Sequence, residues 1–293
     1  MVSPTKYFTY LYLLLLIGFQ SVAQTNPANT INPFFNSKGK LIIIGGGSIP
    51  DSLFTFFAND CGGKDQLIVY IPTATDDEAF IKNGEHLLKF STRGFTNLAT
   101  IHTRNKKDAD DPKNIALMRK AKGLFFGGGD QDLIAAAYGG TKLYDEFIAL
   151  LDRGGVIMGT SAGATIMGSL LIGGDARKDL TKPYAIQPAF SFMQNTAIDQ
   201  HVLARNRQFD LIPVIENNPN TLGVGLDEST AMLVEAGKFK IWGSSYAMIY
   251  DPEDWKIQKK QWGRVVKPFK MMSSGEVFNL VTRKVEASVI ATD

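Results

Sequence analysis

The sequence predicts an α/β fold built on a doubly wound, mainly parallel sheet. Two observations lead to this prediction. Short apolar runs alternate with segments of helical spacing through residues 40–158, and strands that alternate with helices in this way form parallel sheets covered on both faces. Three of the apolar runs also end in glycine-rich loops, at residues 45–48, 127–131 and 159–163. Ligands of such sheets bind beyond the carboxyl ends of the strands, so these loops are the expected site.

The individual elements follow from hydrophobic periodicity and turn residues. Runs expected to form strands lie at residues 40–44, 67–71, 98–103, 123–126 and 156–158. Segments expected to form helices lie at residues 50–58, 78–93, 110–122, the stretch ending at Ala137, and 144–153. Short runs with tight connections at residues 223–226, 231–235, 239–242, 247–250 and 275–280 predict a small antiparallel C-terminal extension of the sheet. No internal repeat or long linker interrupts the sequence, so residues 38–293 are expected to form a single domain.

The first residues have the pattern of a secretory signal peptide. Lys6 supplies a positive charge, residues 10–19 form an apolar stretch, and Ser21-Val22-Ala23 is a small-residue cleavage site. We therefore expect residues 1–23 to be removed, residues 24–37 to form a flexible leader, and the mature protein to be secreted or periplasmic. No cysteine follows the cleavage site directly, so neither a lipid anchor nor another stable membrane anchor is expected.

The composition excludes several classes of function. The chain has 31 basic and 29 acidic residues, a net charge of +2, and no basic cluster of the size that nucleic-acid binding requires. Cys61 is the only cysteine, which excludes an intrachain disulfide and a cysteine-type zinc site. The loop at residues 45–47 does not continue as a dinucleotide fingerprint, because Pro50 stands where that fingerprint requires glycine. We therefore expect no metal and no cofactor.

The loop at residues 159–163 is a G-x-S-x-G turn between an apolar run and a helix start. Such a turn holds its serine, here Ser161, on a tight bend with the hydroxyl exposed. The backbone N–H of Ala162 would face the same space, and an N–H near Gly129 could complete an oxyanion hole. An ordinary glycine-rich loop would have the same five residues, so the serine needs partners elsewhere in the chain.

A serine nucleophile requires a base and a group that orients this base. His201 is the only histidine after Ser161, and two guanidinium groups follow it closely. Carboxylates that could orient it are Asp175 and Asp179, in the loop after the serine helix, and Asp227 and Glu228, after a later strand. The spacing does not choose among these four.

Four motifs in order resemble the cyanophycinase and dipeptidase E family of serine peptidases. They are Phe126-Gly127-Gly128-Gly129-Asp130-Gln131, Gly159-Thr160-Ser161-Ala162-Gly163-Ala164, Asp199-Gln200-His201 with Arg205 and Arg207, and Gly225-Leu226-Asp227-Glu228-Ser229-Thr230-Ala231. The resemblance covers roughly residues 38–283 and implies a fold similar to class I glutamine amidotransferases.

The resemblance also implies roles for individual residues. Ser161 would be the nucleophile and His201 the base. The acid would come from the loop between them, with Asp179 the best match in spacing and Asp175 the second. The substrate-binding residues would be Gln131, Asp199, Gln200, Arg205, Arg207 and Asp210. Asp210 is a charge reversal, because the family's motif has arginine there.

The resemblance implies a serine exopeptidase of cyanophycinase type that hydrolyses β-aspartyl or aspartyl peptide bonds through an acyl-enzyme, and the signal-peptide pattern predicts that it is secreted. The expected partner is a peptide substrate, and no nucleic acid is expected to bind. The sequence is compatible with a homodimer. Two other hypotheses remain open. One is an esterase of the α/β-hydrolase type, and the other is a non-catalytic binding protein for acidic ligands on the same scaffold.

Overall fold

The computed structural model describes residues 34–172 and 187–286. Residues 1–33, 173–186 and 287–293 lie outside the described part, and with them lie the expected signal peptide, most of the expected leader, and Asp175 and Asp179. The described residues all belong to one compact unit. Among the described residues, no helix is long and apolar enough to cross a membrane.

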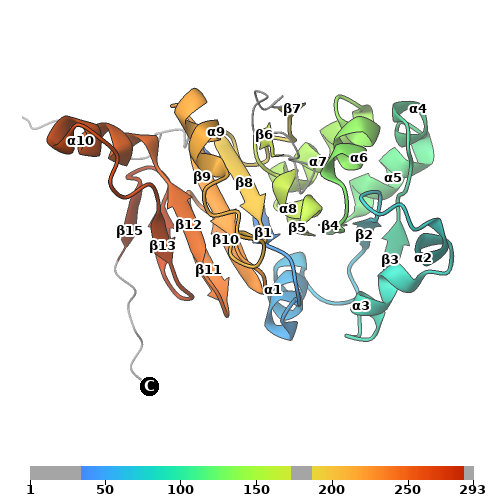
Figure 1. Ribbon diagram of the computed structural model, residues 1–293. Coiled ribbons are helices and arrows are strands. Elements are labelled where there is room, and N and C mark those ends of the chain that lie inside the picture. The colour runs from blue at the N-terminus through green and yellow to red at the C-terminus, as the bar shows by residue number, and fades with distance from the viewer. Residues whose placement is uncertain (1–33, 173–186, 287–293) are drawn as a thin grey trace, which may run out of the picture. The chain divides into compact units, whose positions relative to one another are not determined.

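A nine-stranded main sheet has the order β15-β14-β11-β10-β1-β5-β4-β2-β3 (Figure 1). Its parallel part consists of β1 (Lys40–Ile44), β5 (Val156–Thr160), β4 (Gly123–Phe126), β2 (Ile68–Ile71) and β3 (Leu98–Thr100). An antiparallel part follows β1 on its other side, with β10 (Thr230–Glu235), β11 (Lys238–Gly243), β14 (Val277–Asn279) and β15 (Lys284–Glu286). The expected α/β fold with a mostly parallel sheet is confirmed.

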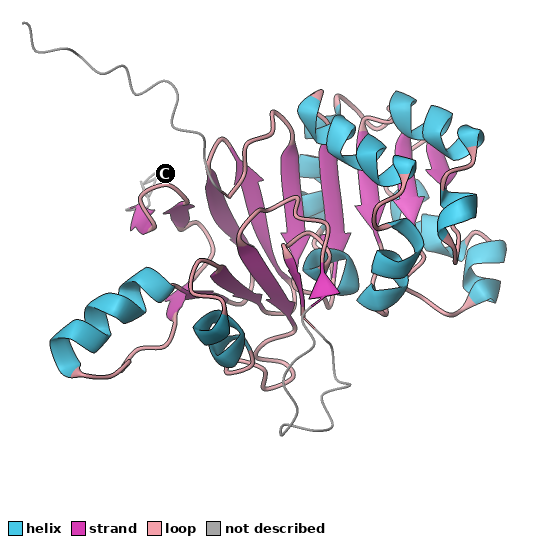
Figure 2. Cartoon of the chain, turned by 90° about the horizontal axis from the view of Figure 1, so that it is seen from above, coloured by secondary structure: helices cyan, strands magenta, loops and turns pink. Residues whose placement is uncertain are grey.

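The central strands are buried on both faces, because helices cover both faces of the parallel part of the main sheet (Figure 2). In β1, Leu41 and Ile43 face one core cluster, and Ile42 and Ile44 face the other, as the two-residue period of a strand requires. The helices that follow the parallel strands are α1 (Asp51–Cys61), α2 (Glu78–Lys82), η1 (Glu85–Leu87), α3 (Leu88–Ser91), α4 (Lys106–Ala109), α5 (Pro112–Lys120), α6 (Gln131–Tyr138), α7 (Lys142–Asp152) and α8 (Ala162–Thr165).

One expected helix is broken into three short pieces. The spacing predicted a continuous helix over residues 78–93, whereas the structure has α2, η1 and α3 there. Gly84 adopts φ +74 between the first two pieces, a left-handed conformation that ends a helix. Helical spacing of apolar residues is retained through the break, so the sequence pattern did not reveal it.

A second, six-stranded sheet was not predicted. Its order is β13-β12-β9-β8-β6-β7, with β13 (Lys270–Met272), β12 (Ala247–Tyr250), β9 (Leu222–Leu226), β8 (Thr196–Gln200), β6 (Leu170–Leu171) and β7 (Gln187–Pro188). The runs at residues 222–226 and 247–250 therefore leave the main sheet, and β9 pairs parallel with β8. Two further helices, α9 (Leu211–Asn217) and α10 (Pro252–Trp262), accompany this part of the chain.

Tight turns carry the chain between the two sheets. Ser229 has φ 55 just before β10, and Gly243 has φ +137 at the end of β11. A Cβ on Gly243 would lie 2.2 Å from the carbonyl oxygen of Ser229, closer than side chains approach. Beyond this close approach the chain enters β12 of the second sheet, which pairs with β9.

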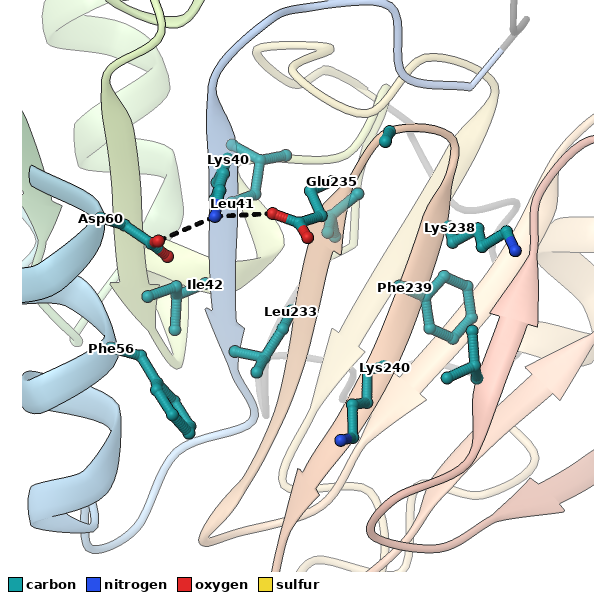
Figure 3. A pocket seen from close by; sticks show the side chains of 13 residues that line it. Lys40, Leu41, Ile42, Phe56, Asp60, Leu233, Glu235, Lys238, Phe239 and Lys240 are labelled. Carbon is teal, nitrogen blue, oxygen red and sulfur yellow. Dashed lines mark hydrogen bonds and ion pairs between the residues drawn. The ribbon is translucent and has the colours of Figure 1, made fainter. Parts of the chain in front are cut away.

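A groove lies over β1, β10 and β11 beside α1 (Figure 3). Its cavity measures about 480 Å³, and its apolar lining includes Phe56, Leu233 and Phe239. At one end Lys40 pairs with Asp60 at 2.8 Å and with Glu235 at 2.7 Å. Lys40 begins β1, so this end of the groove lies at the opposite edge of the sheet from the loop at residues 45–47.

The packed core begins before the expected domain start at residue 38. Phe34 and Phe35 are 5% and 3% exposed, and the Gln194 N–H donates to the Phe34 carbonyl at 2.7 Å. The last part of the expected leader is therefore part of the folded unit.

Replacing Phe35 with alanine should lower the free energy of unfolding by about 3–5 kcal/mol, because it removes a buried aromatic side chain and leaves a cavity. Phe209→Ala is the matched control, since Phe209 is 58% exposed. Urea denaturation of both variants measures the effect. Equal stabilities of the two variants would show that Phe35 does not belong to the core.

Candidate active site

Ser161 lies on a sharp bend between β5 and α8. Its φ is 55, in the left-handed region that residues with side chains seldom adopt. A Cβ on Gly159 would lie 2.4 Å from the carbonyl oxygen of Gly163, and a Cβ on Gly163 would lie 2.3 Å from that of Phe126. Both glycines of the G-x-S-x-G turn are therefore sterically required, as in a nucleophile elbow.

His201 meets Ser161 from the second sheet. It follows β8 with φ 54, and its Nε2 lies 3.0 Å from Ser161 Oγ. The His201 side chain is 7% exposed. The two residues expected as nucleophile and base, 40 positions apart, are therefore in hydrogen-bond contact.

Glu228 completes the chain of contacts on the other side of the imidazole. Its Oε1 lies 2.6 Å from His201 Nδ1, and its side chain is 41% exposed. The carboxylates favoured by resemblance, Asp179 and Asp175, lie outside the described residues, so that prediction stays open. Spacing alone had left Glu228 among four candidates, and the structure brings it to the ring.

Asp227 has a different place from its neighbour. Its Oδ1 accepts the N–H groups of Leu203 and Ala204 at 3.0 and 2.9 Å, and its Oδ2 accepts the Ser245 hydroxyl at 2.6 Å. Burial would raise the pKa of Asp227, but these hydrogen bonds outweigh it and the pKa is lowered. Asp227 therefore fastens the loop that follows His201.

The pKa of His201 lies below its ordinary value, mainly because burial disfavours the charged imidazolium. The hydrogen bond and charge of Glu228 act in the opposite direction, while the charges of Arg205 and Arg207 lower the pKa further. The imidazole is therefore neutral at neutral pH and can accept a proton from Ser161.

The backbone of the loop at residues 127–129 borders Ser161. A Cβ on Gly128 would lie 3.3 Å from Ser161 Cβ, whereas one on Gly129 would lie 2.1 Å from the Ala74 carbonyl oxygen. Within residues 34–172 and 187–286, no acceptor takes the N–H of Gly128, Gly129 or Ala162. The two glycine-rich loops thus face each other across Ser161, as the sequence predicted.

The two glutamines that were expected to bind substrate differ in their surroundings. Gln131 is 4% exposed and donates its side-chain amide to the Ile172 carbonyl at 2.7 Å. Gln200 Oε1 lies 3.5 Å from Ser161 Oγ, the limit of a hydrogen bond. Gln200 therefore adjoins the reacting hydroxyl, and Gln131 holds the chain just before residue 173.

The two arginines that were expected to bind substrate differ in burial and in contacts. Arg207 is 6% exposed, with its Nη1 3.8 Å from Asp199 Oδ1 and 3.3 Å from the Gln200 carbonyl oxygen. Arg205 is exposed, and its charge acts on His201. Asp210 precedes α9, and its N–H donates to the Arg207 carbonyl at 2.9 Å. Of these two arginines, Arg205 is exposed and Arg207 is buried.

Comparison with known proteins agrees with this geometry. The sequence model of Peptidase family S51 matches residues 41–242, more than half of the chain. The chain belongs to peptidase family S51. It is therefore a serine-type peptidase, and its enzymatic class does not depend on the roles of individual residues proposed below.

Relatives with known names support the same family. A cyanophycinase of Synechococcus elongatus is 27% identical over 296 residues, covering 94% of this chain and 92% of that protein. A cyanophycinase of Trichormus variabilis is 28% identical over 227 residues, covering 74% and 75%. The solved structure of a peptidase from an acI-B1 actinobacterium has a TM-score of 0.63 at 20% identity, covering 85% of this peptidase and 98% of that chain. This last likeness shows the fold alone.

Sequence reasoning placed the glycine-rich loop after β1 at the expected site but assigned it no partner. Its dinucleotide interpretation was rejected, and only the other two loops were expected to face each other. In the structure a Cβ on Gly46 would lie 2.1 Å from His201 Cε1, so this loop forms a wall of the site. The contact with His201 depends on long-range packing, for which the local sequence has no signal.

Replacing Glu228 with glutamine should lower the pKa of His201 further, because the variant loses the negative charge that raises it. An NMR titration of histidine-labelled protein measures this shift, and assignment is simple with three histidines. Asp179→Asn is the comparison variant and should leave the titration unchanged. A larger shift in Asp179→Asn than in Glu228→Gln would transfer the role to Asp179.

Proposed function

We propose that this peptidase hydrolyses aspartyl or β-aspartyl peptide bonds through an acyl-enzyme, with Ser161 as nucleophile, His201 as general base and Glu228 as the orienting acid. The observation that carries this proposal is the continuous contact from Ser161 Oγ to His201 Nε2 at 3.0 Å and from His201 Nδ1 to Glu228 Oε1 at 2.6 Å. A nucleophile, a base and an orienting group in this order are the working parts of a serine peptidase.

The first half of the reaction forms the acyl-enzyme. The Ser161 hydroxyl gives its proton to His201 Nε2 as its oxygen attacks the scissile carbonyl carbon. The carbonyl oxygen becomes an oxyanion, which the N–H of Ala162 and an N–H of the Gly128–Gly129 backbone stabilise. The C–N bond then breaks, and His201 returns the proton to the leaving amine.

The second half regenerates the enzyme. A water molecule gives a proton to His201 Nε2 and attacks the ester carbon, and the tetrahedral intermediate expels Ser161 Oγ, which takes that proton back. The product is the carboxylic acid. Throughout both halves Glu228 accepts the Nδ1–H of His201, which fixes the tautomer and stabilises the imidazolium that forms twice.

Two observations support an acidic substrate. The relatives that cover nearly the whole chain are cyanophycinases, and the exposed residue Arg205 lies close enough to the imidazole for its charge to lower the pKa of His201. Guanidinium groups bind carboxylates by paired, charge-assisted hydrogen bonds. A substrate with a free carboxylate near the scissile bond therefore suits this crevice. Aspartyl and β-aspartyl peptides meet this requirement.

Two finer parts of the proposal rest on other features. Asp210, in place of the family's arginine, provides a carboxylate near α9 that suits a basic group of the substrate, such as the guanidinium of β-aspartyl-arginine. Secretion is supported by the signal-peptide pattern of residues 1–23. Cleavage next to a free substrate terminus, as an exopeptidase, follows from the same preference for a nearby carboxylate.

Digestion of cyanophycin, aspartyl-leucine and β-aspartyl-arginine, with products identified by mass spectrometry, tests the substrate class. The wild-type protein should cleave at least one of them, and Ser161→Ala should abolish cleavage while the fold remains intact, because the covalent step is lost. A fluorophosphonate probe should label the wild type and not the variant. Turnover of p-nitrophenyl esters without peptide cleavage would indicate an esterase, and absence of labelling a binding protein.

Removing the charge of Arg205 should lower kcat/KM for aspartyl-leucine by about 10–100-fold, the equivalent of one charge-assisted hydrogen bond. Arg205→Ala is measured beside Arg119→Ala, since Arg119 is an exposed arginine on α5. Arg207→Ala should instead destabilise the fold by about 3–5 kcal/mol, because it leaves the buried Asp199 charge without this partner. Unchanged kinetics in Arg205→Ala would place carboxylate recognition elsewhere.

A further inference from the structure

Three successive carbonyl groups at the end of β1 hold the backbone of the proposed triad. The Ile44 carbonyl accepts the N–H of Ser161 at 3.0 Å, and the Gly45 carbonyl accepts that of His201 at 2.9 Å. The Gly46 carbonyl accepts the N–H of Ser229, next to Glu228, at 2.9 Å. One short stretch of backbone therefore sets the spacing of three chain segments that come from different strands.

Gly46 also lies against the face of the catalytic imidazole. A Cβ at this position would be 2.1 Å from His201 Cε1, 2.5 Å from Nε2 and 2.7 Å from Nδ1. Side chains essentially never approach within 3.0 Å, so only a hydrogen atom fits here. The φ of Gly46 is +111, which also favours glycine.

Contacts at both nitrogens restrict the movement of the imidazole away from position 46. Its two nitrogens are engaged by Ser161 at 3.0 Å and Glu228 at 2.6 Å, and its side chain is 7% exposed. A ring pushed away from position 46 would therefore lose or lengthen at least one of these contacts. Gly47 lies against Glu228 in the same way that Gly46 lies against His201. A Cβ on Gly47 would lie 2.8 Å from Glu228 Cβ and 3.0 Å from Glu228 Oε2.

We propose that Gly46 is a positioning residue for the reaction: its missing side chain is the space that holds the His201 imidazole in line between Ser161 Oγ and Glu228 Oε1. This inference rests on the proposed roles of Ser161, His201 and Glu228. It also explains the glycine-rich loop at residues 45–47 without a phosphate ligand, because the imidazole already fills the space over Gly46 that a ligand would need.

A double-mutant cycle between Gly46→Ala and His201→Ala tests the contact, because such a cycle isolates the coupling between two positions. In the wild-type background, Gly46→Ala should lower kcat at least 100-fold and change KM only a few-fold, since the bound substrate is retained while the base is displaced. In the His201→Ala background, where the ring is gone, the same substitution should cause no further loss of the residual rate.

Stability provides a readout that needs no substrate. Gly46→Ala should lower the denaturation midpoint more in the wild type than in His201→Ala. In His201→Ala the imidazole is absent, so the methyl group of Ala at position 46 occupies the space left by the ring. Gly275→Ala is the matched control for backbone strain, since Gly275 has φ +93 and a Cβ there meets nothing within 4 Å. This control should have the same effect in both backgrounds.

A spectroscopic readout follows the ring itself. The Nδ1 proton of His201, shared with Glu228 at 2.6 Å, should give a downfield NMR resonance in the wild type and in Gly275→Ala, and it should be lost or shifted in Gly46→Ala. Failure of the substrate assignment would leave these two physical readouts intact, so it is distinguishable from failure of this inference.

Two outcomes would support the inference. One is a coupling between positions 46 and 201 in stability together with the displaced resonance. The other is a Gly46→Ala variant that fails to fold while the double variant folds. Equal losses from Gly46→Ala in both backgrounds, or failure of both the single and the double variant to fold, would overturn it and leave Gly46 a purely backbone role.

Discussion

The pairing of β1 with β5 on one side and β10 on the other determines where the active site forms. Ile44 stands opposite Thr160 in the parallel ladder and opposite Ala231 in the antiparallel one. A parallel neighbour ends at the same edge as β1, whereas an antiparallel neighbour begins there. Ser161, just after β5, and Glu228, just before β10, are therefore both delivered to the carboxyl end of β1.

The second sheet delivers the base by the same principle. β8 and β9 are parallel, with Gln200 opposite Leu226, so His201 and Asp227 leave their strands side by side. Asp227 then binds the N–H groups of the two residues at positions 203 and 204. One pair of adjacent acids thus serves two purposes, since Asp227 fastens the loop and Glu228 meets the ring.

These positions are held at a conformational cost. Ser161, His201 and Ser229 all have φ between 54 and 55, a region in which each non-glycine residue loses roughly 1–3 kcal/mol. Each of the three also donates its N–H to a carbonyl at the end of β1. Those hydrogen bonds give each N–H group a partner, and they keep the strained residues in a single geometry.

The sequence was sufficient for features that depend on local pattern. The parallel strands, the tight turn around Ser161 and the facing loop at residues 127–129 each have a signature within a few residues, and the structure confirms them. The second sheet had no such signature, because apolar runs look alike whichever sheet they join. The partner of His201 is also set by long-range pairing, since positions 201 and 228 are brought together by the β8–β9 and β1–β10 ladders.

The same limit explains the outcome for the arginines. Arg205 and Arg207 are identical in type and two positions apart, so the sequence could not tell the exposed arginine from the buried one. The turn after His201 decides, because the Arg205 N–H donates to the His201 carbonyl and the Arg207 N–H to that of Val202. This turn directs Arg207 inward to Asp199 and leaves Arg205 at the surface.

Electrostatics around the imidazole link substrate binding to the chemistry. Burial and the positive charge of Arg205 both lower the pKa of His201, whereas Glu228 raises it. Under the proposed function, a substrate carboxylate paired with Arg205 would offset that positive charge and raise the pKa of His201. The imidazole would then be a stronger base when an acidic substrate is bound than when the site is empty. A neutral substrate would bring no such change, so preference for a carboxylate would extend beyond binding to the proton-transfer step itself.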